Sequence, residues 1–122
     1  MDDRQLLEDA ARAAGLTIHA RNQAERDALI DPATASLWIV DGGTAWNPLT
    51  DDGDALRLAV KLRLAVNHYG EGTAVLLPHH SPEVFSTSPA MVEDNPGDPY
   101  AATRRAIVRA AAAIGRQMRE AT

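Results

Sequence analysis

Helical and extended patterns alternate along this chain, and that alternation limits the folds open to it more than any other sequence feature. Apolar residues recur at helical spacing in three stretches, at residues 2–14 and 54–67 and from residue 98 onward, and the charged stretch 22–29 could be a further short helix. Short extended runs separate them, at residues 16–20, 36–40 and 73–77 and within 83–92. Interleaved helices and strands are typical of layered α/β domains, so we expect that fold class.

Capping residues mark the ends of the first and last helices. Asp2 and Asp3 suit a helix N-terminus, and Gly15 suits the left-handed residue that follows a helix. Asp98 followed by Pro99 is a strong start signal, with aspartate as N-cap and proline in the first turn. The spacing predicts an inner face of the last helix made of Tyr100, Ile107, Ala111, Ile114 and Met118.

The helix predicted at residues 54–67 follows an acidic segment. Thr50 or Asp51 can cap it, and Asp51, Asp52 and Asp54 complement its dipole. Its predicted inner face is Ala55, Leu58, Ala59, Leu62 and Val66. Asp54, Arg57 and Lys61 are expected together on the outer face, and Gly70 and Gly72 are expected to stop the helix.

The extended runs predict one small sheet. The continuous apolar run at 36–40 is consistent with a strand buried on both faces. Residues 70–92 are best interpreted as a hairpin-like antiparallel pair, whose prolines suggest an edge strand. We therefore expect a three-layer α-β-α sandwich with a mixed sheet of about four strands and three main helices. No internal repeat or linker divides residues 1–122, which predicts a single domain.

Composition and charge exclude several classes of function. The chain has no cysteine, which rules out disulfides, thiolate metal sites and thiol catalysis. Its net charge of −5 makes a nucleic-acid partner unfavourable, because such binding usually depends on a positive excess. The acidic start, residues 1–4, does not resemble a signal peptide, and no run of ~18 apolar residues predicts a membrane span.

Two blocks carry a resemblance to a known family. WNPLTDDGDALRLAVKL at residues 46–62 and TRRAIVRAAAAI at 103–114 resemble the signature of the phage ABA sandwich domain family. The resemblance implies an α-β-α sandwich and a small phage or prophage product, in a family mostly of unassigned function. It also implies a location in the cytoplasm of a bacterial host.

Arginines and one tryptophan are the candidate binding residues. Arg105, Arg109 and Arg116 share one face of the last helix and could grip a nucleotide, a nucleic-acid backbone or an acidic protein. They could equally be a solvated face favoured by the helix dipole. Arg57 and Lys61 add cations on the middle helix, and Trp46 could stack on a ligand, although a core plug is the favoured interpretation.

Other polar groups offer weaker chemistry. Asp51, Asp52 and Asp54 could bind Mg²⁺ or Ca²⁺, but helix capping explains them as well. His79 and His80 point to opposite faces if extended, so a loop is favoured over a metal site. Residues 41–44 lack phosphate-loop spacing, and no serine has a nucleophile-elbow setting.

The sequence therefore predicts a non-catalytic accessory protein without a cofactor. Its expected partner is a host or phage protein, or a small anionic ligand, and it could form a homo-oligomer. The alternative is a small metal-dependent enzyme that uses the Asp51–Asp54 cluster.

Overall fold

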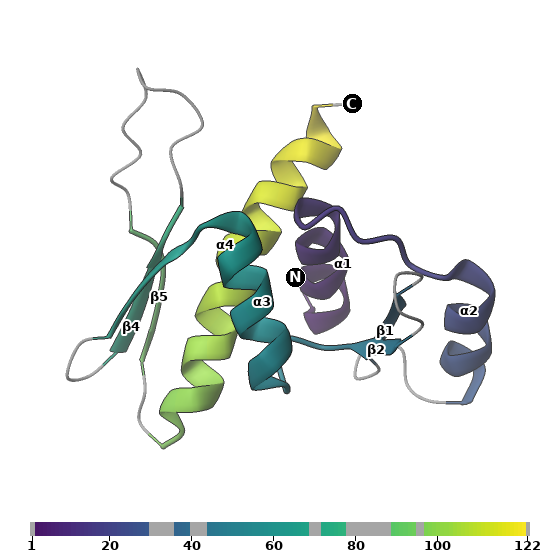
Figure 1. The fold of residues 1–122 in the computed structure, drawn as a ribbon, viewed down its shortest axis with the longest axis horizontal. Coiled ribbons are helices and arrows are strands. Elements are labelled where there is room, and N and C mark those ends of the chain that lie inside the picture. The colour runs from purple at the N-terminus through teal and green to yellow at the C-terminus, as the bar shows by residue number, and fades with distance from the viewer. Residues whose placement is uncertain are drawn as a thin grey trace.

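Helices make up most of the structure, a computed structural model that describes residues 2–29, 36–39, 44–68, 72–77, 89–94 and 97–121. These residues form four helices and five short strands (Figure 1). The helices are α1 (Asp3–Ala13), α2 (Ala20–Leu29), α3 (Asp52–Leu62) and α4 (Pro99–Glu120). The strands are β1 (Leu37–Ile39), β2 (Thr44–Trp46), β3 (Ala65–His68), β4 (Gly72–Leu76) and β5 (Pro89–Asp94). The broad α/β expectation is thereby met.

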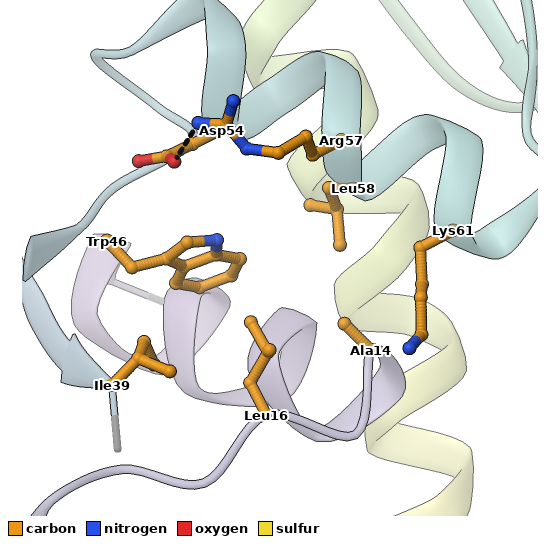
Figure 2. Close-up of a pocket in the computed structure, with 8 residues that line it drawn as sticks. All are labelled: Ala14, Leu16, Ile39, Trp46, Asp54, Arg57, Leu58 and Lys61. Carbon is orange, nitrogen blue, oxygen red and sulfur yellow. Dashed lines mark hydrogen bonds and ion pairs between the residues drawn. The ribbon is translucent and has the colours of Figure 1, made fainter. Parts of the chain in front are cut away.

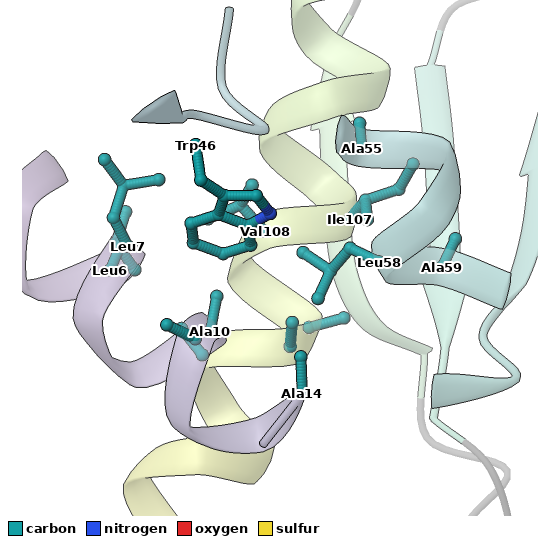
Figure 3. Packing of buried hydrophobic residues seen from close by; sticks show 14 of the residues in the cluster. Leu6, Leu7, Ala10, Ala14, Trp46, Ala55, Leu58, Ala59, Ile107 and Val108 are labelled. Carbon is teal, nitrogen blue, oxygen red and sulfur yellow. The ribbon is translucent and has the colours of Figure 1, made fainter. Parts of the chain in front are cut away.

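The long helix α4 is the centre of the molecule. Figure 1 shows α1 and α3 on one side of α4 and the β4 and β5 strands on the other, with β1, β2 and α2 beyond α1. Small residues let α1 and α4 approach closely, since Ala10, Ala11, Ala110 and Ala111 are almost fully buried. Leu7 and Val108 complete this contact, as Figure 3 shows beside Trp46. The core is therefore mainly helix against helix.

The strands form two separate ladders, which corrects the prediction of one mixed sheet. In the described parts of the chain, every strand pair is antiparallel. Strands β1 and β2 pair with each other, and a second sheet has the order β3-β4-β5. The predicted antiparallel partnership of β4 with β5 is confirmed, with a bulge between Val75 and Leu76. Short strands joined to near neighbours in sequence pair locally, which leaves no parallel crossover.

The predicted strand at 16–20 is reduced to a single bridge between Ile18 and Ile39. The reason lies at His19, which ends the extended segment by starting α2. Its Nδ1 accepts from the backbone N–H of Asn22 at 3.3 Å, and its carbonyl accepts from that of Gln23 at 2.8 Å. The helix predicted at 22–29 is confirmed and begins two residues earlier.

The helix predicted at 54–67 is too long at its C-terminal end. Helix α3 ends at Leu62, because Arg63 adopts the left-handed conformation with φ 55° and ψ 43°. The backbone N–H of Leu64 then bonds the carbonyl of Ala59, which closes the helix. The chain leaves as β3, where Val66 pairs with Val75 of β4. Sheet pairing has overridden the helical spacing of Val66.

The predicted helix starts are confirmed by their caps. The side chains of Asp2, Asp51 and Asp98 each accept a backbone N–H three residues ahead, at 2.8, 2.8 and 3.0 Å. Gly15 has the expected positive φ of 72° after α1.

The predicted inner face of α4 is wrong at its two ends. Ile107 and Ala111 are buried, but Tyr100 is 70% exposed and Met118 is 45% exposed. Burial instead reaches around the central turns, at Ala106, Val108, Ala110 and Ala112 as well. Neighbours surround α4 on several sides at its middle, while its first and last turns extend past them (Figure 1).

Helix α2 is tied to the rest by polar contacts. Arg4 of α1 donates to both carboxylate oxygens of Asp27, each at 3.0 Å. This hydrogen bond, followed by one from Gln23, lowers the pKa of Asp27 below its ordinary value. The buried Gln23 side chain also accepts the backbone N–H of Trp38 at 2.7 Å, which joins α2 to β1. In the part of the chain described, no helix combines the length and apolar character needed to span a bilayer.

Candidate functional site

A pocket of about 370 Å³ opens between the end of α1, strands β1 and β2, and one face of α3. Its volume falls within the usual range for small-molecule sites. Figure 2 shows its walls, which are contributed by Ala14, Leu16, Ile39, Trp46, Asp54, Arg57, Leu58 and Lys61. Four separate segments of the chain therefore build one concave surface.

Trp46 is fixed in this pocket by the turn that follows β2. The backbone N–H of Asn47 donates to Asp54 Oδ2 at 3.0 Å, and the Asn47 side chain accepts from the N–H of Leu49 at 3.0 Å. These bonds lock the end of β2 onto the first turn of α3. Trp46 is only 8% exposed, so it is a core residue whose remaining exposed surface is a wall of the pocket.

The floor of the pocket is apolar. Ile39 comes from β1, Leu58 from α3, and Ala14 and Leu16 from the segment that closes α1. Leu16 is held there because its backbone N–H donates to the carbonyl of Ala11 at 2.9 Å. A floor of this kind favours a ligand with an apolar body, since burying its surface stabilises the complex.

Charged groups lie on the α3 side. Arg57 donates to Asp54 Oδ1 at 2.8 Å, as the dashed line in Figure 2 marks. Arg57 is 72% exposed and also lies 3.8 Å from a carboxylate oxygen of Asp51. Among the residues that the structure describes, none forms an ion pair or hydrogen bond with the Lys61 ammonium. Lys61 is therefore the cation in this pocket that is available to a ligand.

The structure brings together three of the predicted binding residues, Trp46, Arg57 and Lys61. Asp54, a weak metal candidate, lies with them as the partner of Arg57. Sequence reasoning missed Leu16, Ile39 and Leu58 as site residues, because their apolar character signals only burial. The isolated bridge between Ile18 and Ile39 brings the segment that carries Leu16 next to β1. No local sequence pattern predicts this bridge.

The three clustered aspartates do not converge on one point. Asp51 caps α3, and Asp52 Oδ1 accepts from Arg104 at 2.6 Å. Asp54 accepts from Asn47 and Arg57. No group of three or more acidic or histidine side chains within the described residues is arranged to hold a metal ion. His79, His80 and residues 41–43 lie outside the described residues.

The predicted arginine face of α4 is largely engaged within the protein at its N-terminal end. Arg105 donates to both carboxylate oxygens of Asp3 at 3.2 and 3.3 Å, which ties α4 to α1. Arg109 is half-buried, and Arg116 is exposed. Arg119, which was not singled out, donates to the buried Asp9 at 3.1 Å. The arginines therefore do not form one uniform face, and they lie on a different element from the pocket.

Comparisons with protein families, with curated proteins and with solved structures found no match to this chain. The function must therefore be argued from the pocket itself.

Proposed function

We propose that this protein binds a small anionic ligand with an apolar body in the Trp46 pocket, and that it does so without catalysis. The observation that carries the proposal is that an unpaired lysine and Trp46 line the same pocket, across an apolar floor from each other (Figure 2). A few directed polar groups on a mostly apolar concave surface are the usual design of a ligand site.

The wider role proposed is that of a phage or prophage accessory protein in the cytoplasm of a bacterial host. It rests on the resemblance of residues 46–62 and 103–114 to the phage ABA sandwich domain family, and the three-layer sandwich is part of the same proposal. The first block supplies the α3 side of the pocket together with Trp46. A partner protein is a less supported occupant, because Arg105 is already paired with Asp3. The metal-dependent alternative receives no support from the Asp51–Asp54 geometry described above.

The dye anilinonaphthalene sulfonate, an anion with an apolar body, tests the proposal. We expect it to bind with 1:1 stoichiometry, and Lys61→Glu to weaken its binding about tenfold, since a favourable charge becomes an unfavourable one. The readout is a fluorescence titration at low salt, with near-UV circular dichroism confirming that the variant keeps its tertiary packing.

Arg116→Glu is the matched control. It makes the same change in net charge at an exposed position outside the pocket, so we expect its affinity for the dye to equal that of the wild type. Equal losses in both variants would show that the dye senses only overall charge, and an absence of saturable binding by the wild type would contradict the proposal.

A further inference from the structure

The balance of charge in the Trp46 pocket restricts the ligand further. One carboxylate and two cations line it, so the pocket carries a single net positive charge. Arg57 and Asp54 are directly hydrogen-bonded and largely compensate each other. The attraction for an anion therefore comes mainly from Lys61.

From this balance, and resting on the proposed function, we infer that the ligand is a monoanion, namely an alkyl or aryl monocarboxylate. A carboxylate head pairs with one ammonium and leaves no charge unpaired beside the apolar floor. A phosphate monoester carries about −1.5 to −2 charges at neutral pH, and its excess charge would lie near the Asp54 carboxylate. The second charge would find no further cation in the pocket, because Arg57 is already hydrogen-bonded to Asp54.

The indole of Trp46 offers a polar group on the side of the pocket opposite the Lys61 ammonium. Among the described residues, none accepts a hydrogen bond from its Nε1–H. Figure 2 shows the indole nitrogen on the edge of the ring that faces α3, the helix that carries Lys61.

The apolar floor would receive the apolar part of the ligand. Leu16 and Ile39 lie across the pocket from α3 in Figure 2, below the Trp46 ring. An alkyl chain or aromatic ring lying against Ile39 and the Trp46 ring would be removed from water while its head pairs with the Lys61 ammonium, which Figure 2 shows near Ala14. Amphipathic monocarboxylates combine these two features in one small molecule.

Competition against anilinonaphthalene sulfonate distinguishes the classes, with octanoate, octanol and octyl phosphate as probes at pH 7.5. We expect octanoate to displace the dye at about tenfold lower concentration than octanol or octyl phosphate. Lys61→Met should abolish the difference between octanoate and octanol, whereas Lys61→Arg should retain most of it. Arg57→Met should weaken octanoate, because it leaves the Asp54 carboxylate uncompensated in the pocket.

The outcomes separate this inference from the proposed function. Equal displacement by octanol and octanoate, or stronger displacement by octyl phosphate, would overturn the monocarboxylate assignment while the pocket remained a binding site. Retention of the preference for octanoate in Lys61→Met would also overturn it. A wild-type protein that binds neither dye nor probes would contradict the proposed function itself.

Discussion

Single residues decide how closely the central helices approach. At Gly115 of α4, a β-carbon would lie 1.7 Å from the backbone carbonyl oxygen of Asp9 in α1. No rotamer change relieves a contact with backbone, so any side chain there must push the two helices apart. This contact could not be predicted from the sequence, because a glycine within a helix signals only a lower helix propensity until the neighbouring helix is known.

We therefore expect Gly115→Ala to destabilise the protein by about 3 kcal/mol, despite the gain of up to ~1 kcal/mol in helix propensity. The measurement is the midpoint of urea unfolding followed by circular dichroism. Gly97→Ala is the control, since a β-carbon there meets nothing within 4 Å. A neutral or stabilising Gly115→Ala would show that α1 and α4 pack less closely than described.

Arg63 is the opposite case to Gly115, because it has a side chain at a position whose backbone conformation favours glycine. Its φ of 55° lies in the left-handed region at the end of α3. We expect Arg63→Gly to stabilise the protein by about 0.5–1 kcal/mol, whereas Arg63→Ala should not, since alanine keeps the steric penalty. Thermal unfolding compares the two variants, and equal midpoints would argue against the left-handed turn.

At the scale of elements, the helix caps could be predicted from the sequence, but the pairing of one element with another could not. Aspartate before a helix acts through its own backbone neighbours, so Asp2 and Asp98 are readable in the sequence. Whether residues 65–68 continue α3 or form a strand depends on pairing with β4, which is distant information that the local pattern does not contain. The same limit applied to the pocket, where Trp46 and Lys61 were singled out individually but their shared cavity depends on Leu16 and Ile39.

The contact of α2 with α1 should depend on pH through Asp27. Its pKa is lowered from the ordinary 3.8 by hydrogen bonds from Arg4 and then Gln23. A lowered carboxyl pKa gives stability that is fully present above the ordinary value and is lost as the pH falls through the lowered one. The stability difference between wild type and Asp27→Asn should therefore stay constant from pH 8 to about 5 and shrink below 3.8.

Urea midpoints of both proteins across this range provide the test. Glu25→Gln on the same helix is the control, since its pair with Arg21 is highly exposed and should contribute little at any pH. If the stability difference between wild type and Asp27→Asn grew as the pH fell, the result would contradict a stabilising Arg4–Asp27 pair.

At the scale of the whole molecule, α4 unites parts that are far apart in sequence. Its ion pair from Arg105 to Asp3 spans 102 positions, and its hydrogen bond from Arg119 to Asp9 spans 110. Its central turns also pack against α3 and the β4–β5 pair. The mixture of helices and strands was predicted from the alternating patterns, but the two separate antiparallel ladders on either side of the helices were not.

The pairing of α1 with α4 has a consequence for how the protein is made. A ribosome adds roughly 5–20 residues each second, so α1 is synthesised about 5 to 20 seconds before the arginines that will hold it. Throughout that interval Leu6, Leu7 and the alanines of α1 have no α4 to cover them. The nascent chain therefore exposes an apolar helix face that chaperones can bind. The native packing of α1 can form only after α4 has left the exit tunnel.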